Sequence, residues 1–477
     1  MRLVSVGRAE PAAVSALAAA ALTYVRHHRE RFVAELGEFV RFASVSAEPR
    51  RATDVAACAA WLAGHVRGLG LSESEVVPTP RHPLVRATWH RAPGRPTALI
   101  YGHYDVVPPD PLDAWRSPPF EATRRGDELY GRGASDDKGQ LFAHIKALEA
   151  YLRTAGRLPI NVTCLFEGEE EIGSPSFESI LASHRRAFSA DVAVVSDTPM
   201  LGPGRPAITY ALRGLLSLEV QVDGPCRDLH SGTFGGAVHN PAQVLCDMLS
   251  TLHDAAGRVA VPGFYDLVRF VDHAEREMMA RTGPSATRFL HDAGIELGWG
   301  ERGYTPYERT TLRPALIVNG LAGGYSGPGP KGVIPAHARA KLSVRLVPDQ
   351  DPEDIAERIE RHLSQIAPPT VRVRIERHSG APPFVVDGEH PVLPAAAAAL
   401  RAGFGTTPVF LRAGGTIPAV GMLRTVLGLS PLLMGFGLPD DGIHGPNERL
   451  HLPTFWRGVE TCIWLLAKLA AAGEHES

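Results

Sequence analysis

Short apolar runs alternate with amphipathic segments along the first part of the chain. The runs Thr97–Tyr101, Ile160–Phe166 and Val192–Ser196 have the length and composition of buried strands. Before and between them, apolar residues recur at helical spacing in Ala52–Leu69 and Gln140–Thr154. This alternation of strands and helices predicts an α/β layer in which polar loops follow the strand ends.

The pattern changes after Arg213, where two strand–helix–strand passages follow one another. Their predicted elements are strand Leu215–Val222, helix Asn240–Leu252, strand Ala338–Leu346, helix Pro352–Ile366 and strand Val371–Arg377. Residues 254–313 are polar and show no periodicity, so we expect them to be irregular. The passages predict a smaller α+β domain, with helices on one face of its sheet, inserted into the first domain.

The last part of the chain returns to helices and glycine-rich loops and ends in a predicted helix over Thr454–Ala471. A chain of 477 residues is longer than one compact core accommodates. We therefore predict a discontinuous catalytic domain, formed by residues 1–212 and 379–477 and built on a mixed sheet flanked by helices. The inserted domain covers residues 213–378.

Composition and charge narrow the class of protein. Hydrophobic residues make up 44% and charged residues 21% of the chain, as in most globular proteins. The formal net charge is −3 and no basic run occurs, which argues against a nucleic-acid partner. Residues 12–22 are apolar, as in a signal peptide, but they continue into Tyr24–Val40 with helical spacing, which favours one long amphipathic helix. No later segment is long and apolar enough to cross a membrane.

The cysteines are odd in number and far apart, and none forms a CxxC or a Cys–His cluster. They are Cys58, Cys164, Cys226, Cys246 and Cys462. This pattern supports neither a disulfide framework nor a thiolate metal site. Reduced, mostly buried thiols predict a cytoplasmic protein.

Five polar segments carry side chains that bind divalent cations, and most of them follow an apolar run. They read GHYDVVPP from Gly102, GRGASDDKG from Gly131, EGEEEIGS from Glu167, VVSDTPM from Val194 and DDGIHGPNE from Asp440. Their candidate ligands are His103, Asp136, Glu171, Asp197 and His444. Imidazole and carboxylate groups suit zinc, manganese and cobalt, and a carboxylate can bridge two ions. Such a pair of ions stabilises both an attacking water and the oxyanion that forms at a carbonyl.

Each segment also has an ordinary structural interpretation. His103 alone is typical of a hydrogen-bonded histidine at a strand end, but Asp105 projects to the same side and can support it as a ligand. Asp136 and Asp137 are typical of an N-cap pair before the helix Gln140–Thr154. The run Glu169–Glu171 is typical of a solvated face, although adjacent carboxylates at a sheet edge repel one another unless a cation compensates. The metal centre is favoured because all five segments agree, and it closes only if His444 returns to the first domain.

Taken together, these motifs resemble those of the dinuclear metallopeptidase family that includes carboxypeptidase G, succinyl-diaminopimelate desuccinylase, aminoacylase and the carnosinases. They are most similar to its cytosolic non-specific dipeptidase branch. The likeness extends over nearly the whole chain and also includes ITYALRG, DLHSGTFGG, GGYSGPGPKGVIPAHARAKLSVRLVP and GGTIPAV. It implies two divalent metal ions, a small peptide substrate, and an inserted domain that serves as a lid and forms a homodimer.

The resemblance implies that five residues hold the two ions, which are zinc, or alternatively manganese or cobalt. One ion takes His103 and Asp197. The other takes Glu171 and His444, and Asp136 bridges the two.

Three further residues match catalytic positions of the family. Glu170 matches the general base, which takes a proton from the water between the ions. Asp105 matches the carboxylate partner of His103. His230 in DLHSG matches a histidine that reaches across the dimer and stabilises the oxyanion.

Substrate contacts follow from the same resemblance. Arg345 resembles the arginine that clamps the substrate carboxylate, a task for which a bidentate guanidinium is suited, although a surface salt bridge is its alternative on residue type alone. Gly415 and Thr416 match the loop that contacts the substrate backbone. Ala413 departs from the family, because relatives carry Glu before this loop. That departure puts the handling of a free substrate α-amino group in doubt.

We therefore expect metal-dependent hydrolysis of a peptide bond in a dipeptide or a similar small C-terminal amide. One alternative is hydrolysis of N-acyl or N-carbamoyl amino acids at the same centre, which Ala413 favours. A second alternative is a non-catalytic metal- or peptide-binding protein on the same fold.

Overall fold

The computed structural model describes residues 12–386, 388 and 390–472, and the chain divides into two compact units. Unit 1 comprises Met1–Tyr210, Val386–Leu411 and Pro418–Ser477, and unit 2 comprises Ala211–Val385 and Arg412–Ile417. Unit 1 is therefore discontinuous and unit 2 is inserted into it, which is the arrangement that the sequence predicts. The finer division at residues 212 and 378 into catalytic domain and lid stays a prediction.

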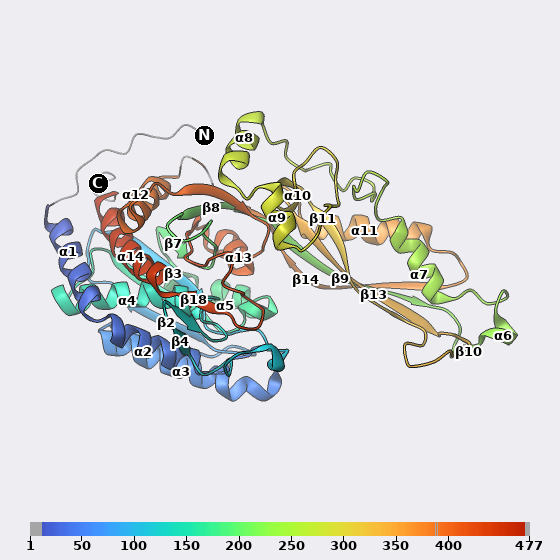
Figure 1. Ribbon diagram of the computed structural model, residues 1–477, viewed down its shortest axis with the longest axis horizontal. Helices are drawn as coiled ribbons and strands as arrows, with labels where there is room; N and C mark the ends of the chain where they lie inside the picture. Colours follow the sequence, from blue (N-terminus) through green and yellow to red (C-terminus); the bar gives the residue numbers. More distant parts are fainter. Residues whose placement is uncertain (1–11, 387, 389, 473–477) are drawn as a thin grey trace. The chain divides into compact units, whose positions relative to one another are not determined.

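A mixed sheet of nine strands has most of its strands in unit 1 (Figure 1). Its strands are β1 (Glu73–Val77), β2 (Leu84–Trp89), β3 (Thr97–His103), β6 (Asn161–Glu167), β7 (Val192–Val195), β8 (Ala207–Leu212), β15 (Phe384–Val385), β16 (Val409–Ala413) and β17 (Pro431–Leu433). Their order is β1-β2-β6-β3-β7-β17-β8-β15, with β16 paired to β8. The pairs β3–β6, β3–β7 and β7–β17 are parallel. This parallel centre brings the carboxyl ends of β3, β6 and β7 to one edge of the sheet.

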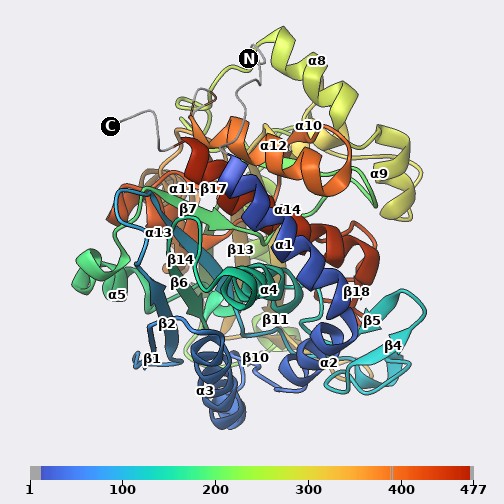
Figure 2. The same cartoon turned by 90° about the vertical axis from the view of Figure 1, so that its left-hand side faces the viewer.

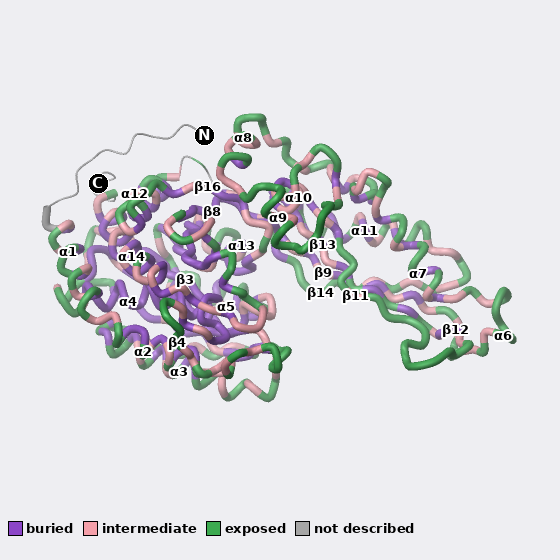
Figure 3. Tube along the Cα trace, viewed as in Figure 1, coloured by how far each residue is buried: buried purple, intermediate pink, exposed green. Residues whose placement is uncertain are grey.

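Helices of unit 1 cover this sheet. They are α1 (Ala12–His27), α2 (Arg29–Val40), α3 (Ala52–Leu69), α4 (Lys138–Ala155), α5 (Phe177–Ser183), α12 (Val392–Phe404), α13 (Pro418–Leu427) and α14 (Leu452–Ala472), with 3₁₀ turns η1 (Pro49–Arg51), η2 (Leu112–Ala114), η3 (Glu170–Ile172) and η4 (Arg185–Phe188). Helix α4 packs on β3, and α1, α2 and α14 pack against α4 (Figure 2). Residues 138–151 of α4 are all buried (Figure 3), so α4 is the central helix of the unit.

A small antiparallel sheet brings two of the candidate ligand segments together. Its order is β18-β5-β4, formed by Arg449–His451, Glu128–Tyr130 and Thr123–Arg125. Arg449 pairs with Tyr130 in this sheet. The loop that follows β5 and the loop that precedes β18 are therefore neighbours, although they lie more than 300 residues apart along the chain.

Unit 2 is built on a four-stranded antiparallel sheet in the order β11-β13-β9-β14. Its strands are β9 (Gly214–Asp223), β11 (Ala315–Gly323), β13 (His337–Leu346) and β14 (Arg372–Ala381). Helices α7 (Pro241–Ser250) and α11 (Pro352–Ile366) pack on this sheet. A separate short pair is formed by β10 (Leu229–His230) and β12 (Val333–Ile334). Burial alternates along β9, where Leu216, Leu218, Val220 and Val222 all enter the core. This alternation is the reason that the sequence predicts the strand.

The prediction that residues 254–313 are irregular was wrong in part. This stretch contains α8 (His273–Thr282), α9 (Ala286–Asp292) and α10 (Pro306–Thr311). Each begins at a side-chain N-cap, supplied by Asp272, Ser285 and Thr305 respectively. These helices are short and polar, so they lack the apolar stripe by which periodicity detects a helix. The buried Arg412 guanidinium pairs with Glu275 at 2.7 Å and holds α8 in place.

The single long helix predicted up to Val40 is two helices, because His28 leaves the helical conformation with φ −116° and ψ 16°. Its ring Nδ1 lies 2.8 Å from the carbonyl oxygen of Tyr24. In a continuous helix that carbonyl would accept the backbone N–H of His28. The His28 N–H bonds to Val25 instead.

All five cysteines lie among the described residues and are free thiols. Cys58, Cys164 and Cys462 are buried, and Cys226 and Cys246 are exposed. Within the described ranges, every helix is too short or too polar to span a bilayer.

His144 gives α4 a pH-dependent contribution to stability. Its buried ring lies 2.7 Å, through Nε2, from Ser196 Oγ, and burial lowers the His144 pKa from 6.5 to about 4. Between these pH values the unfolded chain binds more protons at His144 than the folded protein does. The contribution to the free energy of unfolding is therefore fully present above pH 6.5 and is lost as the pH falls toward 4. The loss is on the order of 3 kcal/mol. We expect His144→Gln to lose less thermal stability than the wild type between pH 7 and pH 5. An equal loss in both proteins would contradict this.

Candidate metal centre

The parallel strands β3, β6 and β7 each deliver predicted site residues to the same edge of the sheet. His103 is the last residue of β3 and pairs in register with Glu167 at the end of β6. Glu170 and Glu171 follow β6 in η3, and Asp197 follows β7. The carboxyl edge of parallel strands is where α/β proteins bind their ligands.

Asp136 faces two imidazole rings with its two carboxylate oxygens. Oδ1 lies 3.1 Å from Nε2 of His103, and Oδ2 lies 3.0 Å from Nε2 of His444. Ligand atoms bound to one ion at about 2.1 Å lie about 3–3.5 Å apart, so both spacings fit a divalent ion. The geometry suits a carboxylate that is shared between two ions.

Glu171 and Asp197 flank the two imidazoles. Glu171 Oε2 lies 3.2 Å from Nε2 of His444, and Asp197 Oδ2 lies 3.9 Å from Nε2 of His103. Ligand atoms of His103, Asp136 and Glu171 all lie within 4.8 Å of one another. The structure therefore brings together all five residues that the sequence predicts as ligands.

The electrostatics of this cluster favour a bound cation. Burial, and then the charges of neighbouring carboxylates, raise the pKa of Asp197 well above its usual range, and burial also raises the pKa of Glu171. Burial alone would raise the pKa of Asp136 as well, but hydrogen bonds from His103 and His444 lower it overall. The cluster thus contains more carboxylates than imidazoles, and divalent cations would offset the repulsion among the carboxylates. The donor set fits a metal centre.

Asp105 links His103 to the turn that follows β6. Nδ1 of His103, the ring nitrogen that faces away from Asp136, lies 3.1 Å from the Asp105 backbone oxygen and 3.4 Å from the Asp105 side-chain Oδ1. The same carboxylate accepts the backbone N–H groups of Glu170 at 3.2 Å and Glu171 at 3.1 Å. A side chain in this position orients the imidazole and fixes the turn together.

The three adjacent glutamates differ in their surroundings. Glu169 is buried and accepts hydrogen bonds from the His82 N–H at 2.8 Å, the Thr79 hydroxyl at 2.8 Å and the Ser176 N–H at 3.0 Å, so it holds the local backbone. Glu171 faces His444. Glu170 is partly buried, and its pKa is raised well above the usual range by burial first and then by nearby carboxylates, against the lowering effect of a nearby imidazole.

The other predicted site residues lie in unit 2. Arg345 on β13 donates through Nη1 to the Thr416 hydroxyl at 2.9 Å, and that hydroxyl donates to the backbone oxygen of Arg213 at 2.7 Å. Gly415 precedes Thr416 in the same loop. His230 ends β10, and its Nδ1 accepts the Gly232 N–H at 3.1 Å. Unit 2 therefore brings Arg345 and the Gly415–Thr416 loop together, while His230 occupies another strand end of that unit.

Sequence reasoning missed the acidic groups behind the cluster. Asp137 Oδ2 accepts the backbone N–H of His103 at 3.2 Å. Asp441 accepts the Ser135 hydroxyl at 2.6 Å, and burial raises the Asp441 pKa to about 7. Glu448 is fully buried beside the loop that carries Asp136. Their presence in the SDDKG and DDGIHGPNE segments was the available signal, but nothing in the spacing distinguishes these acids from the ligands.

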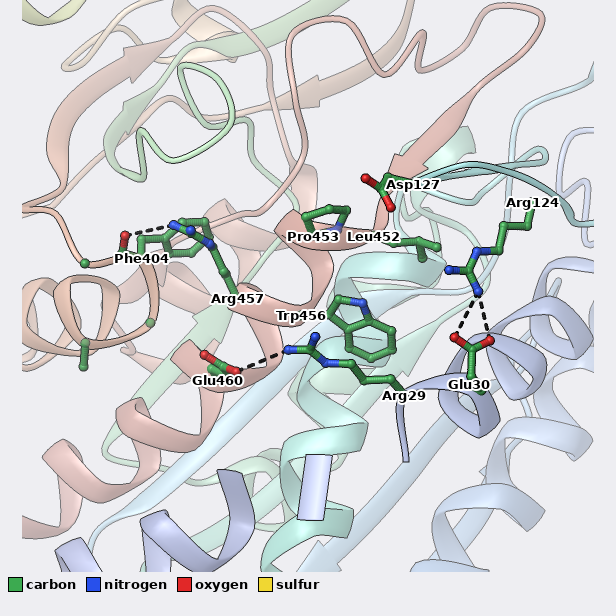
Figure 4. A pocket seen from close by; sticks show the side chains of 13 residues that line it. Arg29, Glu30, Arg124, Asp127, Phe404, Leu452, Pro453, Trp456, Arg457 and Glu460 are labelled. Carbon is green, nitrogen blue, oxygen red and sulfur yellow. Dashed lines mark hydrogen bonds and ion pairs between the residues drawn. The ribbon is translucent and has the colours of Figure 1, made fainter. Parts of the chain in front are cut away.

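A pocket of about 630 Å³ opens elsewhere in unit 1 (Figure 4). In it the Arg29 guanidinium lies 5.3 Å from the centroid of the Trp456 ring and 3.7 Å from a Glu460 oxygen. A second ion pair, of Arg124 with Glu30 at 2.9 Å, lines the same pocket. None of its lining residues is a predicted site residue, so the pocket adds nothing to the metal centre.

Imidazoles and carboxylates at the carboxyl edge of an α/β sheet, with an α+β unit inserted, define a metal-dependent hydrolase. The sequence profile of Peptidase family M20/M25/M40 matches residues 99–468, and the chain belongs to this family. A Cys-Gly metallodipeptidase of Schizosaccharomyces pombe is 31% identical to it, over 93% of this chain and 96% of that protein.

Solved structures agree with this assignment. Human carnosine dipeptidase 1 has a TM-score of 0.84 and 30% identity, covering 97% of this chain and 100% of that chain. An M20 family metallo-carboxypeptidase from Sulfolobus solfataricus has a TM-score of 0.84 and 32% identity, covering 92% and 99%. The protein is thus a peptidase of this family, with its catalytic and inserted lid domains, and the family implies divalent metal ions.

Proposed function

We propose that this enzyme hydrolyses the peptide bond of a dipeptide or a similar small C-terminal amide. The observation that carries the proposal is the position of Asp136, whose two oxygens face His103 and His444 at 3.1 and 3.0 Å. The names of its relatives, a metallodipeptidase, a carnosine dipeptidase and a metallo-carboxypeptidase, all describe cleavage of a small or C-terminal peptide unit.

Two divalent ions, zinc or alternatively manganese or cobalt, would be held by the five clustered residues. His103 and Asp197 serve one ion. Glu171 and His444 serve the other, and Asp136 is shared. When bound, such ions acidify water and polarise a carbonyl oxygen.

Glu170 is the proposed general base. It accepts a proton from the attacking water and returns that proton to the leaving amine. Asp105 fixes both Glu170 and the His103 ring through the contacts described above, so it serves the base and the ligand at once.

Residues of the inserted lid are proposed to bind the substrate. Arg345 clamps the substrate carboxylate, helped by Gly415 and Thr416, and a guanidinium provides the matching bidentate geometry. His230 stabilises the oxyanion, from the partner subunit of a homodimer formed through the lid. The free thiols fit a reducing compartment, and we propose that the enzyme works in the cytoplasm.

Ala413 supports a second candidate function, the hydrolysis of N-acyl or N-carbamoyl amino acids. It ends β16 directly before the Gly415–Thr416 loop and offers no charge to a free α-amino group. An enzyme for N-acyl or N-carbamoyl amino acids needs no such charge. The alternative of a non-catalytic binding protein is set aside, because the chain belongs to a peptidase family.

A substrate panel tests these proposals. With Zn²⁺, Mn²⁺ or Co²⁺ added, we expect free dipeptides to be cleaved faster than the same dipeptides with an acetylated amino group or with the terminal carboxylate converted to a carboxamide. The carboxamide lacks the carboxylate that Arg345 would bind. Faster cleavage of the N-acetyl forms would favour the second function. No hydrolysis of any peptide or amide in the panel would contradict both candidate functions.

A further inference from the structure

Glu448 occupies an unusual position for a side chain so close to a metal centre. Its carboxylate is fully buried and lies four residues beyond His444. Oε1 accepts the backbone N–H groups of Ser135 at 2.9 Å and Asp136 at 3.0 Å. Oε2 accepts the N–H of Gly133 at 2.9 Å. Three amides of one loop therefore converge on one carboxylate, which fixes the backbone from which the Asp136 side chain projects.

Arg132 supplies the fourth donor and extends the arrangement to a second loop. Its guanidinium is also buried, and Nη1 donates to Glu448 Oε2 at 2.7 Å. Nη2 donates to the carbonyl oxygen of Gly445 at 3.0 Å, next to His444. A planar fork can hold both acceptors at fixed separation, whereas a single ammonium cannot. The Trp115 ring covers the guanidinium at 5.4 Å.

The loop of His444 has an uncommon backbone conformation. His444 and Asn447 have φ values of 61° and 62°, in the left-handed region, which few residues other than glycine adopt although histidine and asparagine do so more often than most. Arg132 holds Gly445 and the buried Glu448 ends this stretch. The ion pair therefore constrains both sides of the Asp136–His444 contact.

We propose that Glu448, paired with Arg132, is the positioning residue that sets the spacing between Asp136 and His444, and thereby the affinity of the centre for its metal ions. This inference rests on the proposed function, in which those two residues are ligands. A purely structural ion pair would stabilise unit 1 without affecting metal affinity. The difference between these two roles is measurable.

The test is the zinc affinity of apoprotein carrying Glu448→Gln, measured by competition with a chromophoric chelator. Glutamine keeps the size of the side chain but turns an NH₂ group toward N–H donors, so part of the arrangement breaks. We expect zinc to bind about 10–100-fold more weakly, as when groups behind metal ligands are changed in other proteins. Circular dichroism at the assay temperature confirms that the variant is folded.

Glu149→Gln is the matched control. Glu149 is also a buried carboxylate, 2.8 Å from Lys146 Nζ on α4, but it touches neither ligand loop. We expect it to lower the thermal midpoint and to bind zinc as the wild type does. If Glu448→Gln does not fold, Arg132→Lys is the variant to measure. Lysine keeps the positive charge but cannot donate to both acceptors as the guanidinium does, so we expect a smaller loss of zinc affinity.

The outcomes are separable. Wild-type zinc affinity in folded Glu448→Gln, or in Arg132→Lys if that variant has to serve, would overturn the positioning role. Loss of affinity in Glu149→Gln as well would also overturn it, because any buried defect would then suffice. Wild-type protein that bound none of Zn²⁺, Mn²⁺ or Co²⁺ would instead contradict the proposed function itself.

Discussion

Replacing Glu170 by alanine should leave the metal ions bound and lower turnover by about 10²–10⁴-fold, the usual contribution of a general base. The ion pairs of the cluster join His103, Asp136, Glu171, Asp197 and His444, and Glu170 is not a member of any of them. Its side chain can therefore be removed without removing a ligand. What is lost is the carboxylate that is proposed to accept a proton from the attacking water.

The measurement combines kcat on a cleaved dipeptide with elemental analysis of the same sample. Glu169→Gln is a suitable control, because the neighbouring Glu169 accepts three local hydrogen bonds and lies outside the ion pairs of the cluster. We expect this control to lower the thermal midpoint while kcat stays close to that of the wild type. Turnover in Glu170→Ala close to that of the wild type would exclude Glu170 as the base. Loss of metal from that variant would show that Glu170 is a ligand instead.

Much of the fold follows from the sequence, because the relevant signals are local. Helices α3 and α11 begin and end where the periodicity predicts, at Ala52–Leu69 and Pro352–Ile366. In α11 the amphipathic spacing coincides with an N-cap at Asp351 and proline in the first turn. The segments that carry the candidate ligands could be found for a related reason: polar residues after apolar strands in an α/β pattern converge on one edge of the sheet.

The buried groups that contact the loops of the candidate ligands could not be predicted, because they act through contacts between distant segments. Glu448 and Arg132 are 316 residues apart, and most of the donors to Glu448 are backbone amides, which leave no mark on the sequence. The small sheet that makes these segments neighbours has strands of three residues each, too short for a periodic signal. The short helices at residues 273–311 depend likewise on caps and ion pairs rather than on an apolar face.

A second cluster of metal-binding residue types, Glu35, His65 and Glu149, shows why composition alone does not define a metal site. Here the Lys146 ammonium already occupies the position of a cation. Its Nζ lies 2.8 Å from Glu149 Oε2 and 3.0 Å from His65 Nε2, and it also pairs with Glu35. Burial, and then Lys146, lower the His65 pKa to about 4, so the ring is a neutral acceptor at pH 7. The Phe142 ring faces the ammonium at 4.4 Å.

Lys146→Met should therefore destabilise unit 1 by about 3–5 kcal/mol, the usual result of removing one partner of a buried ion pair. Without the Lys146 ammonium, the buried Glu149 and its neighbour Glu35 have only Arg31 as a cation among the ion pairs of the described residues. Calorimetric unfolding measures the effect. The double variant Lys146→Met/Glu149→Leu should regain part of the stability, since replacing both partners by apolar groups is often neutral. If the single variant melted at the wild-type temperature, the ammonium would not be the cation that balances this cluster.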